Sequence, residues 1–445
     1  MNSPEVSDAV GPPGPGSEGP LSISVVSPGW PANAFPNGVV TSLTSIVPEL
    51  RRMGHAVQVL ASRVAEGGSR AGAADSGGVF DLRSEGGPIG PIGWLGDRLR
   101  YRIDPRGAND HRQCRAILNV ARRLAEGPGP HILEMEEAFG WPRLVGPRCP
   151  MPVVVRLHGP WFLNGPNNGA DPASPEFARR VRKEGLAMAS AGAITAPSRD
   201  VLERSRAYYG LALEGAEVIP NATPQIPEAD RWRREGSDPD RILFIGRFDL
   251  HKGGDTIIDA FARLLRDRPS ARLSFVGPDR GLERDGRRWN LEAYVEHRLP
   301  GALGDGRVEW LGQRPNTELN ALRRRAAVTV SPSRDENFPM AIIEALAVGC
   351  PIVAARAGGA AEAFEHETHG LYVRPADPGD LAAALSRMLA DPARAAAMGA
   401  AAAEHCRRNY SPEVVAEQTL RFYRRVLAKG ATQGDFTQKQ KEPRP

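Results

Sequence analysis

Two glutamates in the last third of the chain have the spacing and surroundings of a ligand-binding pair. Residues 327–330 predict a buried strand, and Pro339 is placed as the first residue of a helix, where its missing N–H costs nothing. Glu336 therefore lies on the loop between strand and helix, and Glu344 lies in the second turn of the helix. Carboxylates in such positions can accept hydrogen bonds from the hydroxyl groups of a ligand.

The helix that carries Glu344 is apolar on nearly every side, which is typical of a buried helix. The residues three and four positions away from Glu344 carry no charge: Met340, Ala341, Ala347 and Val348. A buried carboxylate without a partner destabilises a fold by several kcal/mol unless it is hydrogen-bonded or protonated. We therefore expect the hydroxyl groups of a bound ligand to satisfy Glu344.

Two cations follow another predicted strand, residues 241–245, at its carboxyl end. Arg247 and Lys252 lie in the turn that leads to a predicted helix over residues 256–265, with Asp255 as its N-cap. Two cations beside the positive end of a helix can hold a diphosphate. The turn does not match the Gly-x-x-x-x-Gly-Lys-Ser/Thr pattern, so a mononucleotide kinase is excluded. The alternative is a pair of solvated surface charges.

Three residues beside predicted strands in the first half of the chain are further candidates. Gly38 opens a helix after the first strand, where a glycine allows close approach of a phosphate or sugar, and the alternative is a simple turn glycine. His158 follows strand 152–157 at the edge of the expected cleft, and the alternative is a structural histidine. Glu136 follows strand 132–135 as a candidate acceptor-side carboxylate, with Glu134 and Glu137 as further possibilities, and a solvated loop is the alternative.

An Asp-x-Asp sequence at residues 238–240 matches the pattern with which other transferases bind Mg²⁺ or Mn²⁺ together with a nucleotide diphosphate. It lies in a polar segment just before a strand, which favours a turn over a metal site. No Ser/His/Asp or Cys/His grouping supports hydrolysis by an enzyme nucleophile. We therefore expect neither a metal ion at this Asp-x-Asp sequence nor hydrolysis by an enzyme nucleophile.

The elements that position these residues form two similar series. Strands and helices alternate over residues 21–222 and again over residues 241–411, with a polar, proline-containing linker at residues 223–240 between them. Each series predicts a doubly wound, Rossmann-like α/β domain. Because ligands bind beyond the carboxyl ends of parallel strands, two such domains that face each other create a shared cleft. A glycine-rich interruption at residues 62–110 is too long for an ordinary connection.

Length and composition fit this organisation. A chain of 445 residues exceeds the size at which one hydrophobic core keeps growing, so two domains are expected. The net charge of +4 is mild, and no basic cluster interleaved with aromatic residues indicates nucleic-acid binding. The first segment, residues 1–20, and the last, residues 430–445, are polar or rich in Pro and Gly, so both are expected to be disordered.

The cysteines and the absence of membrane signals bear on the compartment. Four cysteines are far apart and form no Cys-x-x-Cys pair, which argues against zinc or a disulfide framework and fits a reducing cytosol. The sequence shows no secretory signal and no apolar run long enough to span a bilayer. We therefore expect a cytoplasmic protein, and peripheral contact with the inner face of the membrane stays open.

Taken together, these residues resemble the retaining glycosyltransferases of family 4, which have the GT-B fold. In that family a Glu-x7-Glu motif occupies a strand, a loop and a helix, as Glu336 and Glu344 do here. An Arg-x4-Lys sequence follows the first strand of the second domain, as Arg247 and Lys252 do. The resemblance covers nearly all of residues 21–429, and its C-terminal half is the more specific.

The resemblance implies roles at a nucleotide-sugar site. Glu344 would bind the ribose hydroxyls of the donor, and Arg247 and Lys252 would bind its diphosphate. The donor sugar would be held by Glu336 and by the backbone of Asn337, Phe338 and Pro339.

The resemblance extends to the first domain. His158 would contact the donor sugar near the reacting carbon, and Gly38 would lie near the phosphate and the acceptor. The final helix, residues 412–429, would pack back on the first domain. The family usually has Gly where Asn337 stands, and this difference bears on the choice of donor.

The reaction implied by the resemblance is the transfer of a hexosyl-type sugar from a nucleoside diphosphate sugar to a hydroxyl group. The acceptor would be a glycan, a lipid-linked molecule or a small molecule, and configuration would be retained without a metal or other cofactor. Arg247, Lys252 and helix dipoles would stabilise the leaving diphosphate. The alternatives are a GT-B nucleotide-sugar epimerase and a non-catalytic subunit that binds a nucleotide sugar or glycan. The complete set of candidate residues argues against the non-catalytic subunit.

Overall fold

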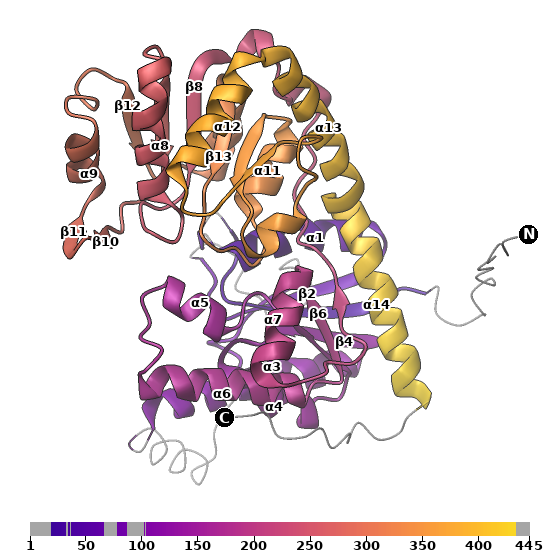
Figure 1. The fold of residues 1–445 in the computed structure, drawn as a ribbon. Helices are drawn as coiled ribbons and strands as arrows, with labels where there is room; N and C mark the ends of the chain where they lie inside the picture. Colours follow the sequence, from indigo (N-terminus) through magenta and orange to yellow (C-terminus); the bar gives the residue numbers. More distant parts are fainter. Residues whose placement is uncertain are drawn as a thin grey trace, which may run out of the picture.

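The computed structural model describes residues 19–32, 34–35, 37–65, 78–86, 102 and 104–432. These residues form two lobes, which lie one above the other in Figure 1. The two ends that were predicted to be disordered fall almost entirely outside the described residues, as does much of the glycine-rich interruption at residues 62–110.

The N-terminal lobe is built on a seven-stranded parallel sheet with the strand order β3-β2-β1-β4-β5-β6-β7. Its strands are β1 Ser22–Ser27, β2 Ala56–Ala61, β3 Val79–Asp81, β4 His131–Glu136, β5 Val153–Arg156, β6 Ala193–Ala196 and β7 Glu217–Val218. Its helices are α1 Gly38–Arg52, α3 Pro105–Ala125, α4 Trp141–Val145, α5 Trp161–Asn167, α6 Pro175–Ala189 and α7 Arg199–Tyr209. The strand order reverses between β1 and β4, which places a crevice at the carboxyl ends of these strands.

The C-terminal lobe repeats this design with a six-stranded parallel sheet in the order β12-β9-β8-β13-β14-β15. Its strands are β8 Asp238–Ile245, β9 Arg272–Val276, β12 Val308–Gly312, β13 Ala326–Ser331, β14 Ile352–Ala355 and β15 Leu371–Val373, and a hairpin is formed by β10 Leu282–Arg284 and β11 Arg287–Trp289. Its helices are α8 Gly254–Asp267, α9 Leu291–Arg298, α10 Asn316–Arg325, α11 Met340–Val348, α12 Pro378–Ala390 and α13 Pro392–Tyr410. Here the reversal lies between β8 and β13.

The central strands of the C-terminal sheet are apolar because helices cover both of its faces. All four residues of β14 are buried. Val353 and Ala355 pack in the core with residues of α8 and α12, whereas Ile352 and Ala354 pack in the core with residues of α11 and α13. The alternation follows from the twofold side-chain period of a strand. Such a layered core gives the loops at the strand ends a rigid support.

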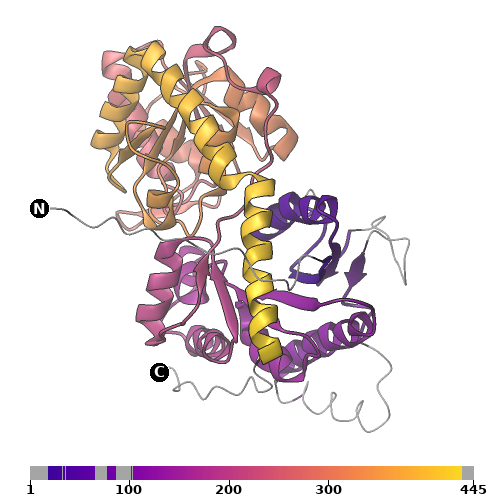
Figure 2. The same cartoon turned by 90° about the vertical axis from the view of Figure 1, so that its right-hand side faces the viewer.

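The long last helix, α14 Pro412–Thr432, links the two lobes. It leaves the C-terminal lobe after α13 and runs along the N-terminal lobe in yellow in Figure 2. Val415 and Leu420 pack in one core with Val47 of α1. The buried hydroxyl of Tyr423 donates a 2.8 Å hydrogen bond to Glu134 Oε2 in β4. The helix therefore joins the C-terminal lobe to the first domain.

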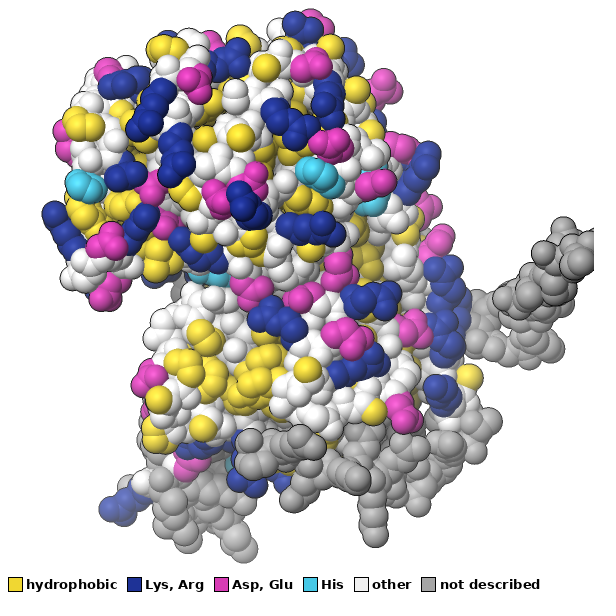
Figure 3. Space-filling view, viewed as in Figure 1, with side chains coloured by type: hydrophobic (Ala, Val, Ile, Leu, Met, Phe, Trp, Pro, Cys, Tyr) yellow, Lys and Arg dark blue, Asp and Glu magenta, His cyan; other side chains and the backbone are white. Residues whose placement is uncertain are grey.

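The surface in Figure 3 differs between the two lobes on the side shown. Side chains of both charges cover the upper, C-terminal lobe, whereas hydrophobic side chains gather over the region where Figure 1 places α5 and α7. On these helices Phe162 and Tyr208 stack with ring centroids 4.1 Å apart. Within the described ranges, no helix is both long and apolar enough to cross a membrane.

The sequence predicts strands over residues 56–61, 193–196 and 272–276 and a helix over residues 175–189. The elements β2, β6, β9 and α6 begin and end at these residues. The Asp-x-Asp sequence is an exception, because β8 begins at Asp238 and the sequence is the start of a strand rather than a linker turn. Asp238 pairs with Arg241 at 3.2 Å, and Asp240 pairs with Arg268 at 3.1 Å. Both carboxylates therefore have arginine partners.

Candidate functional site

The two motifs found in the sequence are carried by neighbouring parallel strands. Lys252 lies on the loop between β8 and α8, and Glu336 lies on the loop between β13 and α11. Because β8 pairs with β13, both loops leave the sheet at the same carboxyl edge. Lys252 Nζ lies 2.6 Å from Glu336 Oε1, and the two side chains are 28% and 12% exposed. The motifs thus converge on one site, as expected.

A glycine shapes the loop that carries Lys252. Gly253 caps the N-terminus of α8 with φ 72°, and a Cβ at this position would lie 2.3 Å from the carbonyl oxygen of Pro332. The prediction that Asp255 caps this helix is wrong. Asp255 is buried in the first helical turn, where its Oδ2 pairs with Arg334 Nη2 at 2.7 Å. The segments that follow β8 and β13 are therefore held together in two ways. Gly253 packs closely on the backbone of Pro332, and Asp255 forms an ion pair with Arg334.

The expectation that Glu344 has no charge partner is wrong. Arg323 of α10 donates a hydrogen bond from Nη2 to Glu344 Oε2 over 2.6 Å, and the arginine side chain is only 1% exposed. The neighbours of Glu344 within its own helix are uncharged, whereas its partner lies 21 residues earlier, on another helix. The Glu344 side chain is 21% exposed, so its carboxylate is held in place and still accessible to a ligand.

Arg247 reaches from the C-terminal lobe to the N-terminal lobe. Its Nε lies 2.8 Å from Asp249 Oδ2 on the same loop, and its Nη1 donates a 3.3 Å hydrogen bond to Asn168 Oδ1, just after α5. A guanidinium group held in this way stands at the carboxyl end of β8, beside the N-terminus of α8. The arrangement fits a group that receives an anionic ligand between the two lobes.

His158 lies on the turn after β5, and a buried carboxyl group holds the backbone of this turn. The amide nitrogen of His158 donates to Glu137 Oε2 over 3.0 Å, and that of Gly159 donates to Glu137 Oε1 over 3.0 Å. Glu137 follows β4, the strand that pairs with β5, and is 3% exposed. Glu137 was expected only as a possible acceptor-side carboxylate beside Glu136, and its hydrogen bonds to this turn were not predicted.

Burial changes the protonation of this part of the site. Burial, with a smaller effect of Arg156, lowers the pKa of His158 to about 3, so its imidazole is neutral at ordinary pH. Burial, together with Glu184 and Glu136, raises the pKa of Glu137 to about 8. The turn therefore carries an imidazole that is neutral at ordinary pH, and the carboxyl group that binds its backbone has a raised pKa.

Glu136, the predicted acceptor-side carboxylate, ends β4 next to Glu137. Burial raises its pKa to about 7, although Arg180 acts in the opposite direction. Arg180 pairs through Nε with Glu184 Oε1 at 3.0 Å, and Glu184 Oε2 also accepts a 2.6 Å hydrogen bond from the amide of Trp161. The solvated-loop alternative therefore does not describe this segment, in which Glu136 and Glu137 have raised pKa values, as does Glu184 on α6.

The residues after Glu336 differ in what they contact. Asn337 Nδ2 donates to Asn164 Oδ1 over 2.7 Å, and the carbonyl oxygen of Asn337 accepts a 2.7 Å hydrogen bond from Ser198 Oγ. Phe338 instead packs edge to face on Tyr410 in the C-terminal core. Pro339 is the N-cap of α11 rather than its first helical residue. Asn337 thus joins its loop to the opposite lobe by a side-chain hydrogen bond.

Gly38 is the first residue of α1, and the side chain of Asn37 caps this helix by accepting a 2.8 Å hydrogen bond from the amide of Val39. A Cβ added at Gly38 would meet nothing within 4 Å, so the position is open. Its predicted approach to a phosphate or an acceptor stays a prediction.

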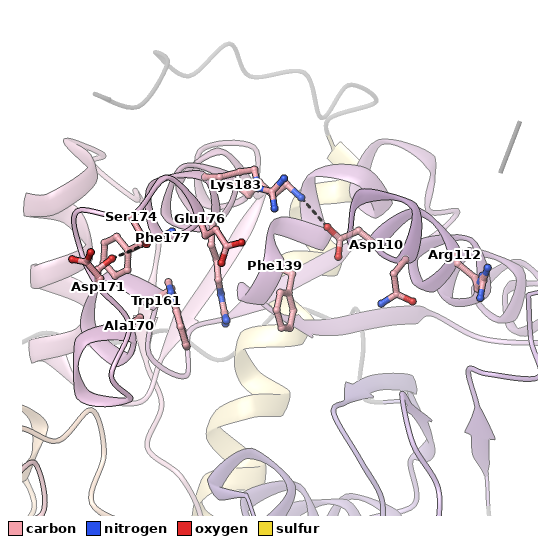
Figure 4. A pocket seen from close by; sticks show the side chains of 13 residues that line it. Asp110, Arg112, Phe139, Trp161, Ala170, Asp171, Ser174, Glu176, Phe177 and Lys183 are labelled. Atoms are coloured by element: carbon pink, nitrogen blue, oxygen red, sulfur yellow. Dashed lines mark hydrogen bonds and ion pairs between the residues drawn. The ribbon is translucent and has the colours of Figure 1, made fainter. Parts of the chain in front are cut away.

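A cavity of about 870 Å³ lies in the N-terminal lobe near the turn of His158. Figure 4 shows Trp161 and Phe139 in its middle, with Asp171 and Ser174 toward one end and Asp110 and Arg112 toward the other. The guanidinium of Arg180 lies 3.6 Å from the ring centroid of Trp161 and 4.3 Å from that of Phe139. The cavity thus offers aromatic surface and polar groups of both charges, a combination that suits a hydroxyl-rich molecule.

Two family models match the chain. The model described as Glycosyltransferase Family 4 matches residues 36–224, and the model described as Glycosyl transferases group 1 matches residues 226–405. The first covers most of the N-terminal lobe, and the second covers most of the C-terminal lobe.

Curated relatives and solved structures agree with these matches. The chain is 32% identical over 219 residues to glycogen synthase from Mycobacterium tuberculosis. This match covers 48% of this chain and only half, 50%, of the length of that relative. It is 30% identical over 333 residues to D-inositol 3-phosphate glycosyltransferase from Nocardiopsis dassonvillei, covering 72% of this chain and 74% of that protein.

The solved structure of HepE from Anabaena in complex with UDP has a TM-score of 0.61 and 19% identity, and the match covers 90% of this chain and 99% of that one. This likeness concerns the fold, in which two Rossmann-like domains face each other. Sequence and fold lead to the same conclusion: the chain belongs to the group 1 glycosyltransferases, and its two domains have the GT-B fold.

Proposed function

We propose that this protein transfers a hexosyl-type sugar from a nucleoside diphosphate sugar to a hydroxyl acceptor, with retention of configuration and without a metal. The observation that carries the proposal is the meeting of Lys252 and Glu336, 2.6 Å apart, at the carboxyl edge of β8 and β13. HepE from Anabaena, which shares the fold, has been solved in complex with UDP and with UDP-glucose. That precedent supports a nucleotide-sugar donor for this chain.

The donor would lie along the carboxyl edge of the C-terminal sheet. Arg323 occupies one oxygen of Glu344, which leaves the other oxygen to accept hydrogen bonds from the ribose hydroxyls. Arg247 and Lys252 bind the diphosphate beside the N-terminus of α8, where the helix dipole adds to their charge. Glu336 accepts hydrogen bonds from the hydroxyls of the sugar.

The reaction needs stabilisation of the negative charge that develops on the leaving diphosphate. Arg247 and Lys252 supply fixed positive charge at that place, which is electrostatic catalysis. The bond between the anomeric carbon and the phosphate oxygen breaks while the acceptor oxygen attacks from the same face. The acceptor proton passes to the departing phosphate oxygen, so the step needs no enzyme nucleophile.

His158 acts in this scheme as a neutral hydrogen-bonding group next to the reacting carbon. Its low pKa keeps positive charge away from the sugar face, and Glu137 holds the backbone of the turn. The neutral ring can still donate through one nitrogen and accept through the other.

The acceptor would enter from the cavity that contains Trp161 and Phe139. Trp161 is three residues beyond His158, and three residues of extended chain span at most about 10 Å. An acceptor in the cavity can therefore present a hydroxyl group to a sugar held at His158. Glu136, with a pKa of about 7, lies at the end of the strand that leads to Phe139.

The test has two stages. UDP-, GDP- and ADP-sugars are screened for thermal stabilisation of the protein, because a ligand at 100 times its Kd adds about 2.7 kcal/mol to the free energy of unfolding. The stabilising donor is then incubated with candidate glycan, lipid-linked and small-molecule acceptors in the presence of a chelator, and the anomeric configuration of the product is read by NMR. Stabilisation by no nucleotide sugar contradicts the proposal, as does an inverted product or activity that disappears with the chelator.

A further inference from the structure

The loop that carries Glu336 is held by the opposite domain on both sides of that residue. Asp335 and Asn337 both contact the N-terminal lobe, whereas Glu336 between them pairs with Lys252 of its own lobe. A residue whose two neighbours are fixed has little freedom in its own backbone. The orientation of the Glu336 carboxylate therefore depends on the position of the N-terminal lobe.

The first of these contacts is an ion pair with α7. Arg204 Nη1 lies 2.9 Å from Asp335 Oδ1 and 3.1 Å from Asp335 Oδ2. The same Nη1 also lies 3.2 Å from Asp200 Oδ2, one turn earlier on α7. The side chains of Arg204 and Asp335 are 38% and 22% exposed, so the pair is only partly screened by water. Asp200 fixes the arginine in the direction of the opposite lobe.

The second contact connects Asn337 with the turn of His158. Asn164 accepts from the Asn337 amide through Oδ1 and donates through Nδ2 to the carbonyl oxygen of Gly159, each over 2.7 Å. A Cβ at Gly159 would lie 2.0 Å from Asn337 Nδ2, so the two loops are as close as a glycine permits. The loop of Glu336 and the turn of His158 are thereby joined through one side chain.

A third set of contacts, made by the short helical turn at residues 358–362, also connects the loop of Glu336 with the N-terminal lobe. The amide of Gly359 donates to the carbonyl oxygen of Glu336 over 2.6 Å. Glu362, in the same short helical turn, accepts hydrogen bonds from the amides of Arg199 and Asp200 over 2.9 and 2.8 Å. The N-terminus of α7 therefore binds the turn at residues 358–362, and this turn also binds the backbone of Glu336.

We propose that Arg204 and Asn164 are positioning residues for the donor sugar, acting on Glu336 through Asp335 and Asn337. The inference rests on the proposed function, because it assigns Glu336 to the sugar. The nucleotide part of the donor is bound by Arg247, Lys252 and Glu344, all within the C-terminal lobe. The sugar part is bound correctly only when the N-terminal lobe is docked, so the sugar site and the His158 turn are assembled in one step.

The experiment compares a nucleoside diphosphate with its nucleotide sugar, using the donor that the screen described above selects. Calorimetry gives the affinity for both ligands, and initial rates give kcat and KM, for the wild type and for Arg204→Gln and Asn164→Ala. We expect the affinity for the nucleoside diphosphate to stay within about twofold, and kcat to fall roughly tenfold or more, because a small misplacement of a binding group is costly. Arg182→Gln, which changes an exposed arginine on α6, is the control and should leave both unchanged.

A charge swap separates positioning from general damage to the fold. Arg204→Asp and Asp335→Arg should each lower kcat, and the double variant should recover a large part of it because the pair is restored in reverse. Unchanged kcat in Arg204→Gln and Asn164→Ala overturns the inference, as does an equal loss of affinity for both ligands or a double variant no better than its parents. A wild type that binds no nucleotide sugar contradicts the proposed function itself, so the two failures are distinct.

Discussion

Lys252 Nζ and Glu336 Oε1 lie 2.6 Å apart, across two loops that leave adjacent strands of the C-terminal sheet. In sequence these residues are 84 positions apart. The lysine carries the charge that a diphosphate needs, and the glutamate carries the acceptor oxygens that a sugar needs. In the proposed donor complex, this contact would place the two halves of a nucleotide sugar next to each other, with the scissile bond between them.

Replacing Lys252 by Met should abolish most of the transfer activity. We expect kcat to fall about a hundredfold or more, because loss of one fixed group that stabilises developing charge typically has an effect of this size. Steady-state rates with saturating donor measure it. Lys252→Arg keeps the charge and should retain part of the activity. A kcat in Lys252→Met within about threefold of the wild type would show that the diphosphate is stabilised elsewhere.

Replacing Arg323 by Met should destabilise the C-terminal lobe by about 3 kcal/mol or more, because it leaves Glu344 without a partner for its largely buried carboxylate. Urea unfolding measures the loss. The double variant Arg323→Met with Glu344→Leu should regain most of this stability, since both charges are gone, yet it should not regain nucleotide binding. If the double variant binds the nucleotide as the wild type does, Glu344 is not a ribose ligand.

The fold was largely predictable because the apolar strands and amphipathic helices follow their periodicities closely. β14 is buried at every position, and β2 and β9 are mostly buried, so each reads as a short apolar run with distinct ends. The start of α8 was not predictable in this way. Asp255 has the side chain of a good N-cap, but Arg334 on a distant loop pairs with it, and Gly253 caps the helix through its backbone conformation instead.

The site residues that belong to a motif with a characteristic spacing could be predicted from the sequence. Residues that join the site only by packing against another element could not. Glu336 and Lys252 were expected in one site and are in contact there. Arg323 was missed, and so was the contact of Glu137 with the turn of His158, because each becomes visible only when two elements are packed together: α10 on α11, and the end of β4 beside the turn after β5. Local sequence patterns carry no information about such tertiary pairs.

Replacing Gly253 by Ala should damage both stability and donor binding. The new Cβ would lie 2.3 Å from the carbonyl oxygen of Pro332, so the loop that carries Lys252 must shift. Gly306→Ala is a matched control, because Gly306 has a similar φ of 76° but nothing within 4 Å of an added Cβ. We expect the control to lose about 1 kcal/mol through backbone strain alone, and Gly253→Ala to lose clearly more and to show a higher KM for the donor. Equal losses in both variants would mean that the loop contact is unimportant.

Glu137 and His158 should affect the free energy of unfolding in opposite directions as the pH changes, with an alkaline limb from Glu137 and an acid limb from His158. The pKa of Glu137 is about 8 in the folded protein against an ordinary value of 4.5, so between these values the folded state holds more protons than the unfolded state, and the free energy of unfolding falls as the pH rises through about 8. His158, with a folded pKa of about 3 against 6.5, acts in reverse: its contribution is present above pH 6.5 and is lost as the pH falls toward 3.

The variant Glu137→Gln isolates the alkaline limb, because glutamine cannot ionise and still offers one oxygen to the amides of His158 and Gly159. Urea unfolding at about pH 6 and about pH 8.5 should show a smaller loss of stability between the two values than in the wild type. Part of the slope should remain, since burial also raises the pKa values of Glu136 and Glu184. His158→Gln should leave this limb unchanged and flatten the acid limb instead. The same alkaline slope in Glu137→Gln and in the wild type would mean that Glu137 is ionised in the folded protein at neutral pH, with its charge stabilised by the two amide hydrogen bonds that hold the turn of His158.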